Sequence, residues 1–210
     1  MSVKSVIHLV KKHIRKILYV NKRKKNLLVR DVSIIASDCT GGVVYNELGL
    51  EFKSPTINMF IPSDDFIRFC KNISYWVDQP MIEIDSPYPY PVAQLGENGV
   101  KLHLVHYKSV SEAQEKWNAR KDRIDYNNLF IIMNDRNGCT YEDMKIFDEM
   151  PFENKVLFSH LPHPELKSVY YIKGNEKNDT VPVMTEYVNK LSFRKNIDQF
   201  DYVSWINKNL

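Results

Sequence analysis

Cysteine, glycine and long apolar runs are scarce in this sequence. The three cysteines, Cys39, Cys70 and Cys139, are scattered over 210 residues and form no CxxC pair. Neither a disulfide framework nor a cysteine metal site is therefore predicted. No apolar run approaches the roughly 18 residues of a membrane-spanning helix, and no signal-peptide core is present. We expect a protein of the reducing cytoplasm.

The common signatures of cofactor and metal sites are also absent. The sequence contains no GxGxxG or GxxxxGK[ST] phosphate loop, no GxSxG elbow and no HExxH zinc motif. It lacks the DxD pair that holds Mg²⁺ against a nucleotide-sugar diphosphate, and Glu83 and Asp85 are the nearest match. The sequence thus predicts no cofactor and no metal, and it leaves a nucleotide sugar open as a co-substrate.

Charge is distributed unevenly along the chain. Residues 1–30 hold 10 of the 29 lysines and arginines and no acidic residue, although the net charge is only +3. The remaining 180 residues carry 19 basic and 26 acidic side chains, a net of −7. This pattern describes an acidic body with a basic N-terminal arm. Nucleic acid is not a predicted partner, because the body is acidic and Tyr19 is the only aromatic residue within the arm.

The arm, residues 1–25, has the periodicity of an amphipathic helix. Its apolar stripe consists of Ile7, Val10, Ile14, Ile17 and Leu18. Lysines and arginines fill much of the remaining surface of the predicted helix. Two interpretations are open. The helix binds the anionic headgroup layer at the inner face of the membrane, or its stripe packs on the body while the lysines face solvent.

Residues 30–210 alternate between strand-like apolar runs and helical periodicity. Strands are predicted at 32–37, 54–61, 81–84, 128–133, 154–159 and 168–172, with a hairpin at 91–106, and helices at 43–49, 63–77, 111–122, 141–150 and 198–209. The alternation indicates a single α/β domain. We predict a three-layer α/β/α, Rossmann-like architecture with a mostly parallel sheet and an inserted antiparallel hairpin.

Three polar loops are expected at the carboxyl edge of this sheet, where α/β proteins bind ligands. Residues 38–42, 134–138 and 160–164 each follow a predicted buried strand. We predict that they line one cleft, with Asp135 of the second loop contacting the ligand.

The first loop reads Asp38-Cys39-Thr40-Gly41-Gly42. Two glycines between a strand and a helix allow a ligand to approach bare backbone N–H groups and a helix N-terminus. Asp38 is then suited to accept hydrogen bonds from sugar hydroxyls. Cys39 is considered as a nucleophile, but we predict that it binds substrate, with Asp38, Gly41 and Gly42, as part of the wall of the cleft. In the alternative, Asp38 or Thr40 caps the helix and Cys39 is a small buried side chain.

The helix predicted at 111–122 places Trp117, Arg120 and Arg123 three residues apart on one broad face. Two arginines can hold a phosphate by paired hydrogen bonds, and a tryptophan can stack on a base or sugar. In the alternative, Trp117 belongs to the core and the arginines pair with acidic neighbours on the surface.

Histidines supply the candidate acid–base groups. His103 and His106 lie on one predicted strand and point to opposite faces. His106 is the better candidate because it lies nearer the strand end. His160 and His163 lie in a loop after a buried strand, and they are interpreted as lacking acidic partners, which makes them a weak metal signal. We predict His106 and His160 as the catalytic candidates, against the alternative of ordinary surface histidines.

Five segments follow one another within residues 30–172: SDCTGGVVYNELGLEFKSPTINMFIPSDDFIRF, YPVAQL, LHLVHYKSVSEAQEKWNARKDRI, NLFIIMNDRNG and FDEMPFENKVLFS. Together they resemble one uncharacterised bacterial α/β family found in capsule and exopolysaccharide biosynthesis clusters. Members of that family often carry Asn-Cys-x-Gly-Gly, where this chain has Asp38. The resemblance implies a three-layer α/β/α fold and a role in surface-glycan assembly.

Two functions follow from these observations. The first is a transferase acting on a nucleotide- or lipid-linked sugar, with the glycines admitting the donor, the arginines holding phosphate and a histidine deprotonating the acceptor. The second is a non-catalytic module that binds a glycan or recruits partner enzymes. In both, the expected partners are a sugar or sugar-phosphate ligand and an anionic membrane surface.

Overall fold

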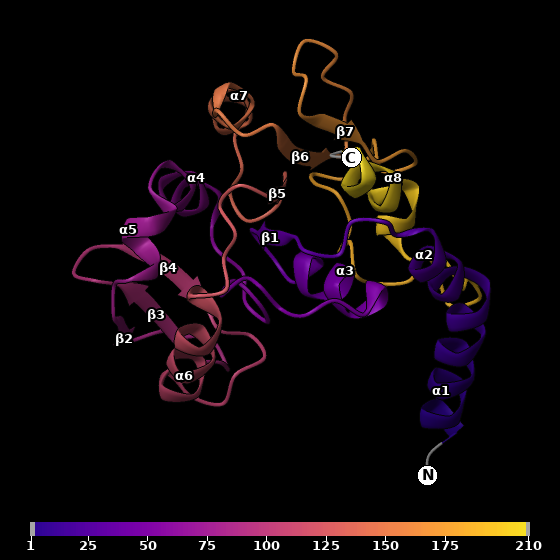
Figure 1. Cartoon of the computed structure of the whole chain (residues 1–210), viewed down its shortest axis with the longest axis horizontal. Coiled ribbons are helices and arrows are strands. Elements are labelled where there is room, and N and C mark those ends of the chain that lie inside the picture. The colour runs from indigo at the N-terminus through magenta and orange to yellow at the C-terminus, as the bar shows by residue number, and fades with distance from the viewer. Residues whose placement is uncertain (1–2, 209–210) are drawn as a thin grey trace.

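The computed structural model describes residues 3–208, with side chains from residue 9 onward. Its centre is a parallel four-stranded sheet in the order β1-β5-β6-β7 (Figure 1). The strands are β1 (Ser33–Ala36), β5 (Leu129–Asn134), β6 (Asn154–Ser159) and β7 (Val169–Tyr171). The predicted α/β class with a mostly parallel sheet is confirmed.

Helices cover both faces of this sheet and make it the middle of three layers. They are α4 (Ser63–Lys71) and α7 (Tyr141–Glu149) on one face, and α3 (Thr40–Leu48) and α8 (Tyr202–Asn207) on the other. Ile35 and Ile131 belong to the first core, whereas their neighbours Ile34 and Ile132 belong to the second. This alternation buries every residue of β1 and β5.

The predicted hairpin is present and forms part of a separate antiparallel sheet. Its strands are β2 (Met81–Ile84), β3 (Val92–Leu95) and β4 (Val100–His103), in that order. Helices α5 (Ile73–Val77) and α6 (Val110–Lys121) lie beside it (Figure 1). The predicted helix 63–77 is divided in two because Asn72, at φ −154°, leaves the helical conformation and caps α5.

The strand predicted at 54–61 does not form. The Ile57 N–H bonds back to the Pro55 carbonyl, and Asn58 has a φ of 64°, so the chain turns instead of extending. Only Phe60 makes a β-bridge, to His103. This segment also bonds to the end of β1, where the Ile61 N–H donates to the Ser37 carbonyl. It therefore connects the antiparallel sheet to the outer edge of the parallel one.

The arm is a helix in three parts that projects from the body (Figure 1). It comprises α1 (Val3–Arg15), the π-helical turn η1 (Lys16–Val20) and α2 (Asn21–Asn26). The side chain of Ile7, in the predicted stripe, lies outside the described residues. None of the described helices is long and apolar enough to cross a membrane.

A network of four charged residues, Arg15, Arg23, Glu47 and Asp198, fixes the arm to the body. We call it the arm network. Arg15 is 3% exposed and donates to both carboxylate oxygens of Glu47, at 2.9 and 2.7 Å, and to both of Asp198, at 2.6 and 2.9 Å. Arg23 donates to Asp198 at 2.7 Å. The arm thus packs on the body, but a charged face makes this contact.

The π-turn explains how both arginines reach the same acids. Eight residues separate Arg15 from Arg23, which in a regular α-helix places them about 80° apart. A π-turn accommodates about one extra residue. It therefore brings Arg23 close to the direction of Arg15.

Candidate active site

The loops that follow β1 and β5 meet at the carboxyl edge of the parallel sheet. The Asp38 carboxylate accepts the backbone N–H of Thr40 and the side-chain amide of Asn134, each at 2.9 Å. The Asn134 oxygen accepts the Arg136 N–H. Asp38 therefore bonds to the first N–H of α3, although Cys39 holds the N-cap position. It also links the ends of β1 and β5.

Asp135 and His160 form a buried carboxylate–imidazole pair at the same edge. The Asp135 side chain is 1% exposed. One of its oxygens accepts the His160 backbone N–H at 2.7 Å and lies 2.5 Å from His160 Nδ1, and the other accepts the Val181 N–H at 2.7 Å. Because a carboxylate only accepts, the proton of a neutral His160 ring lies on Nδ1.

The other ring nitrogen of His160, Nε2, is the chemically open group of this pair. It has no hydrogen-bond partner within residues 9–208, and it is not among the buried atoms that lack one. Nε2 therefore reaches solvent, at a side chain that is 13% exposed. A fixed tautomer with an open Nε2 is the geometry of a general base.

His163, the other histidine of this loop, has weaker surroundings. Its Nδ1 lies 3.5 Å from Glu165, whose side chain is half exposed. The interpretation that both loop histidines lack acidic partners is wrong. The partner of His160 lies 25 residues earlier in the chain and comes close only because β5 and β6 are neighbours.

Cys39 is poorly suited to be a nucleophile. It is the N-cap residue of α3, and its Sγ lies 3.7 Å from the Met59 carbonyl. Burial, with a smaller contribution from the Asp38 charge, raises the pKa of Cys39 to about 12. Since the thiolate is the reactive form, Cys39 is a half-buried packing residue at neutral pH.

Gly41 and Gly42 serve helix packing. A Cβ at Gly41 would lie 2.9 Å from the Ala36 Cβ of β1, and one at Gly42 would lie 3.4 Å from Ile57 Cγ2. At Gly41, β1 occupies the space that the missing side chain leaves, so the glycine allows close packing of α3 on β1. The approach of a ligand to the Gly41 backbone N–H stays a prediction. At Gly42 the close neighbour is likewise a protein side chain.

The predicted phosphate grip of α6 does not join this site. Trp117 is fully buried and donates from its indole N–H to the Val77 carbonyl, so its prediction as a stacking platform is wrong. The Arg120 guanidinium lies over the Phe52 ring and bonds to Tyr107. Arg123 pairs with Glu51. Both arginines follow the alternative of pairing within the protein.

Topology explains this separation. Arg120 and Arg123 stand beside residues 51–52, beyond the outer edge of β1, and α6 leads into the amino end of β5. His160 follows the carboxyl end of β6, two strands further across the sheet. Among residues 9–208, no hydrogen bond or ion pair links either arginine to His160. Their joint action on one ligand stays a prediction.

The two histidines near β4, His103 and His106, have different surroundings. His106 is exposed, and its backbone N–H donates to the Asn58 carbonyl. Its ring has no hydrogen-bond partner among residues 9–208. His103 is 6% exposed and stacks on Phe60 at 4.2 Å. Burial, and to a smaller extent the nearby charge of Lys101, lowers the pKa of His103. His106 stays an untested candidate without a described orienting partner, whereas His160 has one.

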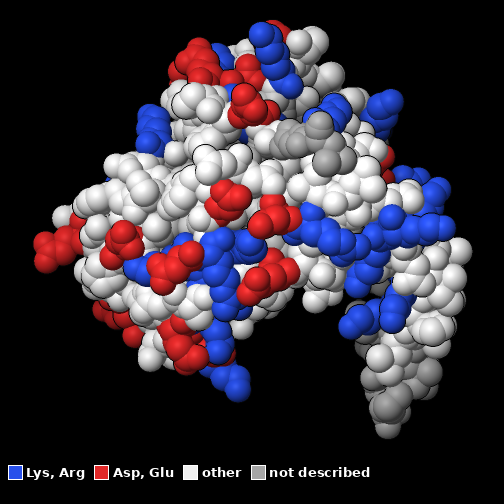
Figure 2. Space-filling model, in the orientation of Figure 1, with Lys and Arg blue, Asp and Glu red and all other residues white. Residues whose placement is uncertain are grey.

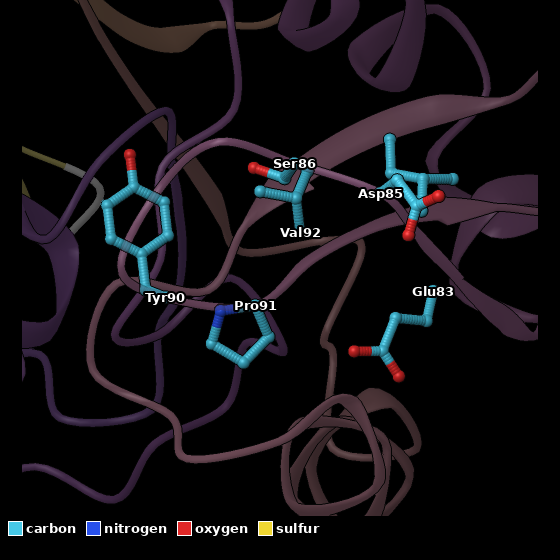
Figure 3. Close-up of a pocket in the computed structure, with 7 residues that line it drawn as sticks. Glu83, Asp85, Ser86, Tyr90, Pro91 and Val92 are labelled. Atoms are coloured by element: carbon cyan, nitrogen blue, oxygen red, sulfur yellow. The ribbon is translucent and has the colours of Figure 1, made fainter.

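A hollow of about 240 Å³ lies on the antiparallel sheet, at the loop that joins β2 to β3 (Figure 3). The carboxylates of Glu83 and Asp85 lie on one side of it and the Tyr90 ring on the other. Tyr90 stacks on Tyr88 with centroids 5.2 Å apart, and its hydroxyl lies 3.5 Å from His103 Nδ1. Carboxylates beside aromatic faces suit a polyhydroxylated ligand.

The described side chains contain no group of three or more histidine, cysteine, aspartate or glutamate residues that could hold a metal ion. Glu83 of β2 and Asp85, which follows the strand, line the same hollow without a third such partner among the described side chains. Asn134 is the residue of the carboxyl-edge site that sequence reasoning missed. Its signal was a polar residue ending the continuous apolar run of β5.

The sequence matches the family model described as "Domain of unknown function (DUF1919)" over residues 10–207. The chain belongs to the DUF1919 family. It is also 38% identical over 194 residues to an uncharacterised protein of Haemophilus influenzae (strain ATCC 51907 / DSM 11121 / KW20 / Rd), covering 92% of this chain and 93% of that protein. The predicted resemblance to an uncharacterised bacterial family is confirmed to this extent.

The arrangement in this DUF1919 chain is thus one polar site at the carboxyl edge and one hollow on the antiparallel sheet. The edge site offers proton transfer at Nε2 of His160, and the Asp135 carboxylate stabilises the imidazolium that would form. The hollow offers hydrogen-bond acceptors and aromatic surface, but no comparably oriented base.

Proposed function

We propose that the protein is a transferase of surface-polysaccharide synthesis that acts on a nucleotide- or lipid-linked sugar at the cytoplasmic face of the membrane. The Asp135–His160 pair carries this proposal. It supplies a base with a fixed tautomer and an open nitrogen, at the sheet edge where α/β proteins bind ligands. The polysaccharide pathway is supported by the sequence resemblance alone.

In the proposed reaction, His160 Nε2 takes the proton of an acceptor hydroxyl as its oxygen attacks the sugar donor. The oxygen forms the new bond, and the donor phosphate leaves with the electrons of the broken one. Asp135 accepts the Nδ1–H and stabilises the imidazolium, which then returns its proton to the leaving group or to water. Nucleotide sugar is the co-substrate, and no cofactor takes part.

Turnover of a panel of nucleotide sugars, read as released nucleotide in the presence of sugar acceptors, tests this role. We expect His160→Gln to lower the rate about 10²- to 10⁴-fold, the usual contribution of a positioned base. His163→Gln is the matched control, since it changes a histidine of the same loop that pairs with an exposed acid. Equal rates in wild type and His160→Gln would remove His160 from the mechanism.

The hollow beside Glu83 and Tyr90 favours a second candidate, a non-catalytic glycan-binding module. Under this alternative the wild type binds members of the same panel without turnover. Binding should then be weakened by Tyr90→Ala and unaffected by His160→Gln. Calorimetry on these two variants distinguishes the module from the enzyme.

A further inference from the structure

The outer face of the arm is apolar although the helix is attached to the body. Leu9, Val10, Ile17 and Leu18 are each 50–56% exposed. Figure 2 shows the projecting helix as largely uncharged, with basic side chains along one flank and at its base. The arm network faces the body, so charged side chains make the contact with the body and aliphatic side chains face outward, unlike in an ordinary surface helix.

Exposed lysines lie next to these apolar side chains. Lys12 and Lys16 follow Leu9 at i+3 and i+7, so the three form one row along the helix, and Ile17 follows Val10 at i+7 in the next row. Both lysines are exposed. Since no acidic residue occurs in residues 1–30, nothing within the arm offsets their charge.

A loop of the body extends the same kind of surface beside the arm. Lys11 Nζ donates to the Lys190 carbonyl at 2.9 Å and lies over the Tyr187 ring. Leu191, next in this loop, is 89% exposed, and Val188 is 51% exposed. Exposed aliphatic side chains thus occur on two segments that contact each other.

We propose that this face of the arm binds an anionic phospholipid surface while the arm network holds the body in place. The acyl boundary accommodates the leucine, isoleucine and valine side chains, and the lipid phosphates attract the adjacent lysines. A phospholipid surface thereby accounts for both the aliphatic side chains and the lysines of this face. Because Arg15 and Arg23 are bound to the body, the helix is a rigid attachment that sets the orientation of the body on the membrane. This inference does not depend on the transferase reaction.

Co-sedimentation of the full chain with vesicles tests the proposal. We expect binding to vesicles containing phosphatidylglycerol, much weaker binding to phosphatidylcholine alone, and loss of binding at high salt, which screens surface charge. Ile17→Gln with Leu18→Gln should weaken binding at least about tenfold, since two aliphatic side chains no longer enter the lipid. Lys12→Gln with Lys16→Gln should weaken it about fivefold per lysine.

Matched controls use the same residue types elsewhere on the surface. Ile82→Gln with Leu161→Gln removes one exposed isoleucine and one exposed leucine away from the arm. Lys71→Gln with Lys173→Gln removes two exposed lysines of the body. Both controls should bind vesicles as the wild type does.

Three results would overturn the proposal. The first is equal binding by the Ile17→Gln, Leu18→Gln variant and the wild type, and the second is equal binding to neutral and anionic vesicles. The third is absence of vesicle binding together with a dimer in analytical ultracentrifugation that the arm substitutions dissociate. That outcome would assign the apolar face to a second copy of the chain.

Discussion

The arm network and the Asp135–His160 pair both place charged side chains in the interior, and they differ in what remains open. In the arm network, Glu47 is bound by Arg15, Lys195 and the Tyr202 hydroxyl, so its acceptors are used within the protein. In the pair, the Asp135 carboxylate is equally occupied, but His160 Nε2 is left to solvent.

This difference distinguishes a cluster that stabilises the fold from a pair that can transfer a proton. A buried ion pair whose groups are all satisfied fixes the position of an element, here the arm. A buried carboxylate that orients an imidazole with one open nitrogen prepares a proton transfer. The number of buried charges therefore says little about whether a cluster is structural or chemical. The deciding feature is whether one of its polar atoms is left without a partner.

Removing the cation of the arm network should have the largest effect on stability. Arg15→Ala leaves Glu47 and Asp198 buried without their main partner, and we expect a loss of about 3–5 kcal/mol in the free energy of unfolding. Urea denaturation measures this loss. Lys53→Ala is the control, because Lys53 pairs with the exposed Asp31 and should cost less than about 1 kcal/mol. Equal costs for both variants would contradict the structural role of the network.

Acid should weaken the same network by a smaller amount. Burial opposes ionisation of Glu47 and Asp198, but hydrogen bonds, from Arg15 first, outweigh it and hold their pKa values below the ordinary 4.5 and 3.8. The unfolded chain therefore binds protons more readily than the folded one. This contribution to stability is complete at neutral pH and is lost as the pH falls through the lowered pKa values.

Urea midpoints measured between neutral pH and about pH 3 test this sign. The decline on acidification should be smaller in Glu47→Gln than in the wild type, because one titrating carboxylate is gone. A wild-type midpoint that is constant or rises toward acid would show that the two carboxylates do not have lowered pKa values.

The smallest expected change concerns Thr40, beside Asp38 at the site. Its hydroxyl oxygen is buried and has no hydrogen-bond partner among residues 9–208. Thr40→Val removes this unsatisfied group at nearly constant shape and should stabilise the free protein by about 1 kcal/mol. Thermal unfolding measures the gain. A loss of stability would show that the Thr40 hydroxyl has a hydrogen-bond partner in solution. Thr56→Val is the control: it removes an acceptor of the Ala36 N–H and should destabilise the protein.

The sequence predicts the parallel strands well and the 54–61 segment poorly. Residues 129–133 form a continuous apolar run, and residues 156–158 form a shorter one within the predicted strand 154–159. Both runs are bounded by polar residues, as in the central strands of an α/β sheet. Residues 54–61 also contain several apolar residues, but the turn at Pro55–Ile57 and the left-handed Asn58 depend on hydrogen bonds with β1. Local propensity cannot anticipate those contacts.

The candidate site shows the same limit. His160 was identifiable because it follows a buried strand, and Asp135 because it follows another. Their pairing required knowledge that β5 and β6 are neighbours. The prediction for Trp117 is wrong because helical spacing defines a shared face without telling whether that face meets the core, a partner side chain or solvent.

Composition and periodicity alone determined the α/β class, the basic arm, the acidic body and the loops at the carboxyl edge. These are properties of residue order, set by side-chain period and by charge. Tertiary structure alone decided that Asp135 orients His160 and that the arm turns its arginines inward and its leucines outward. Both outcomes depend on partners distant in the chain, Val181 and Asp198 among them, whose contact energies act only after the layers have packed.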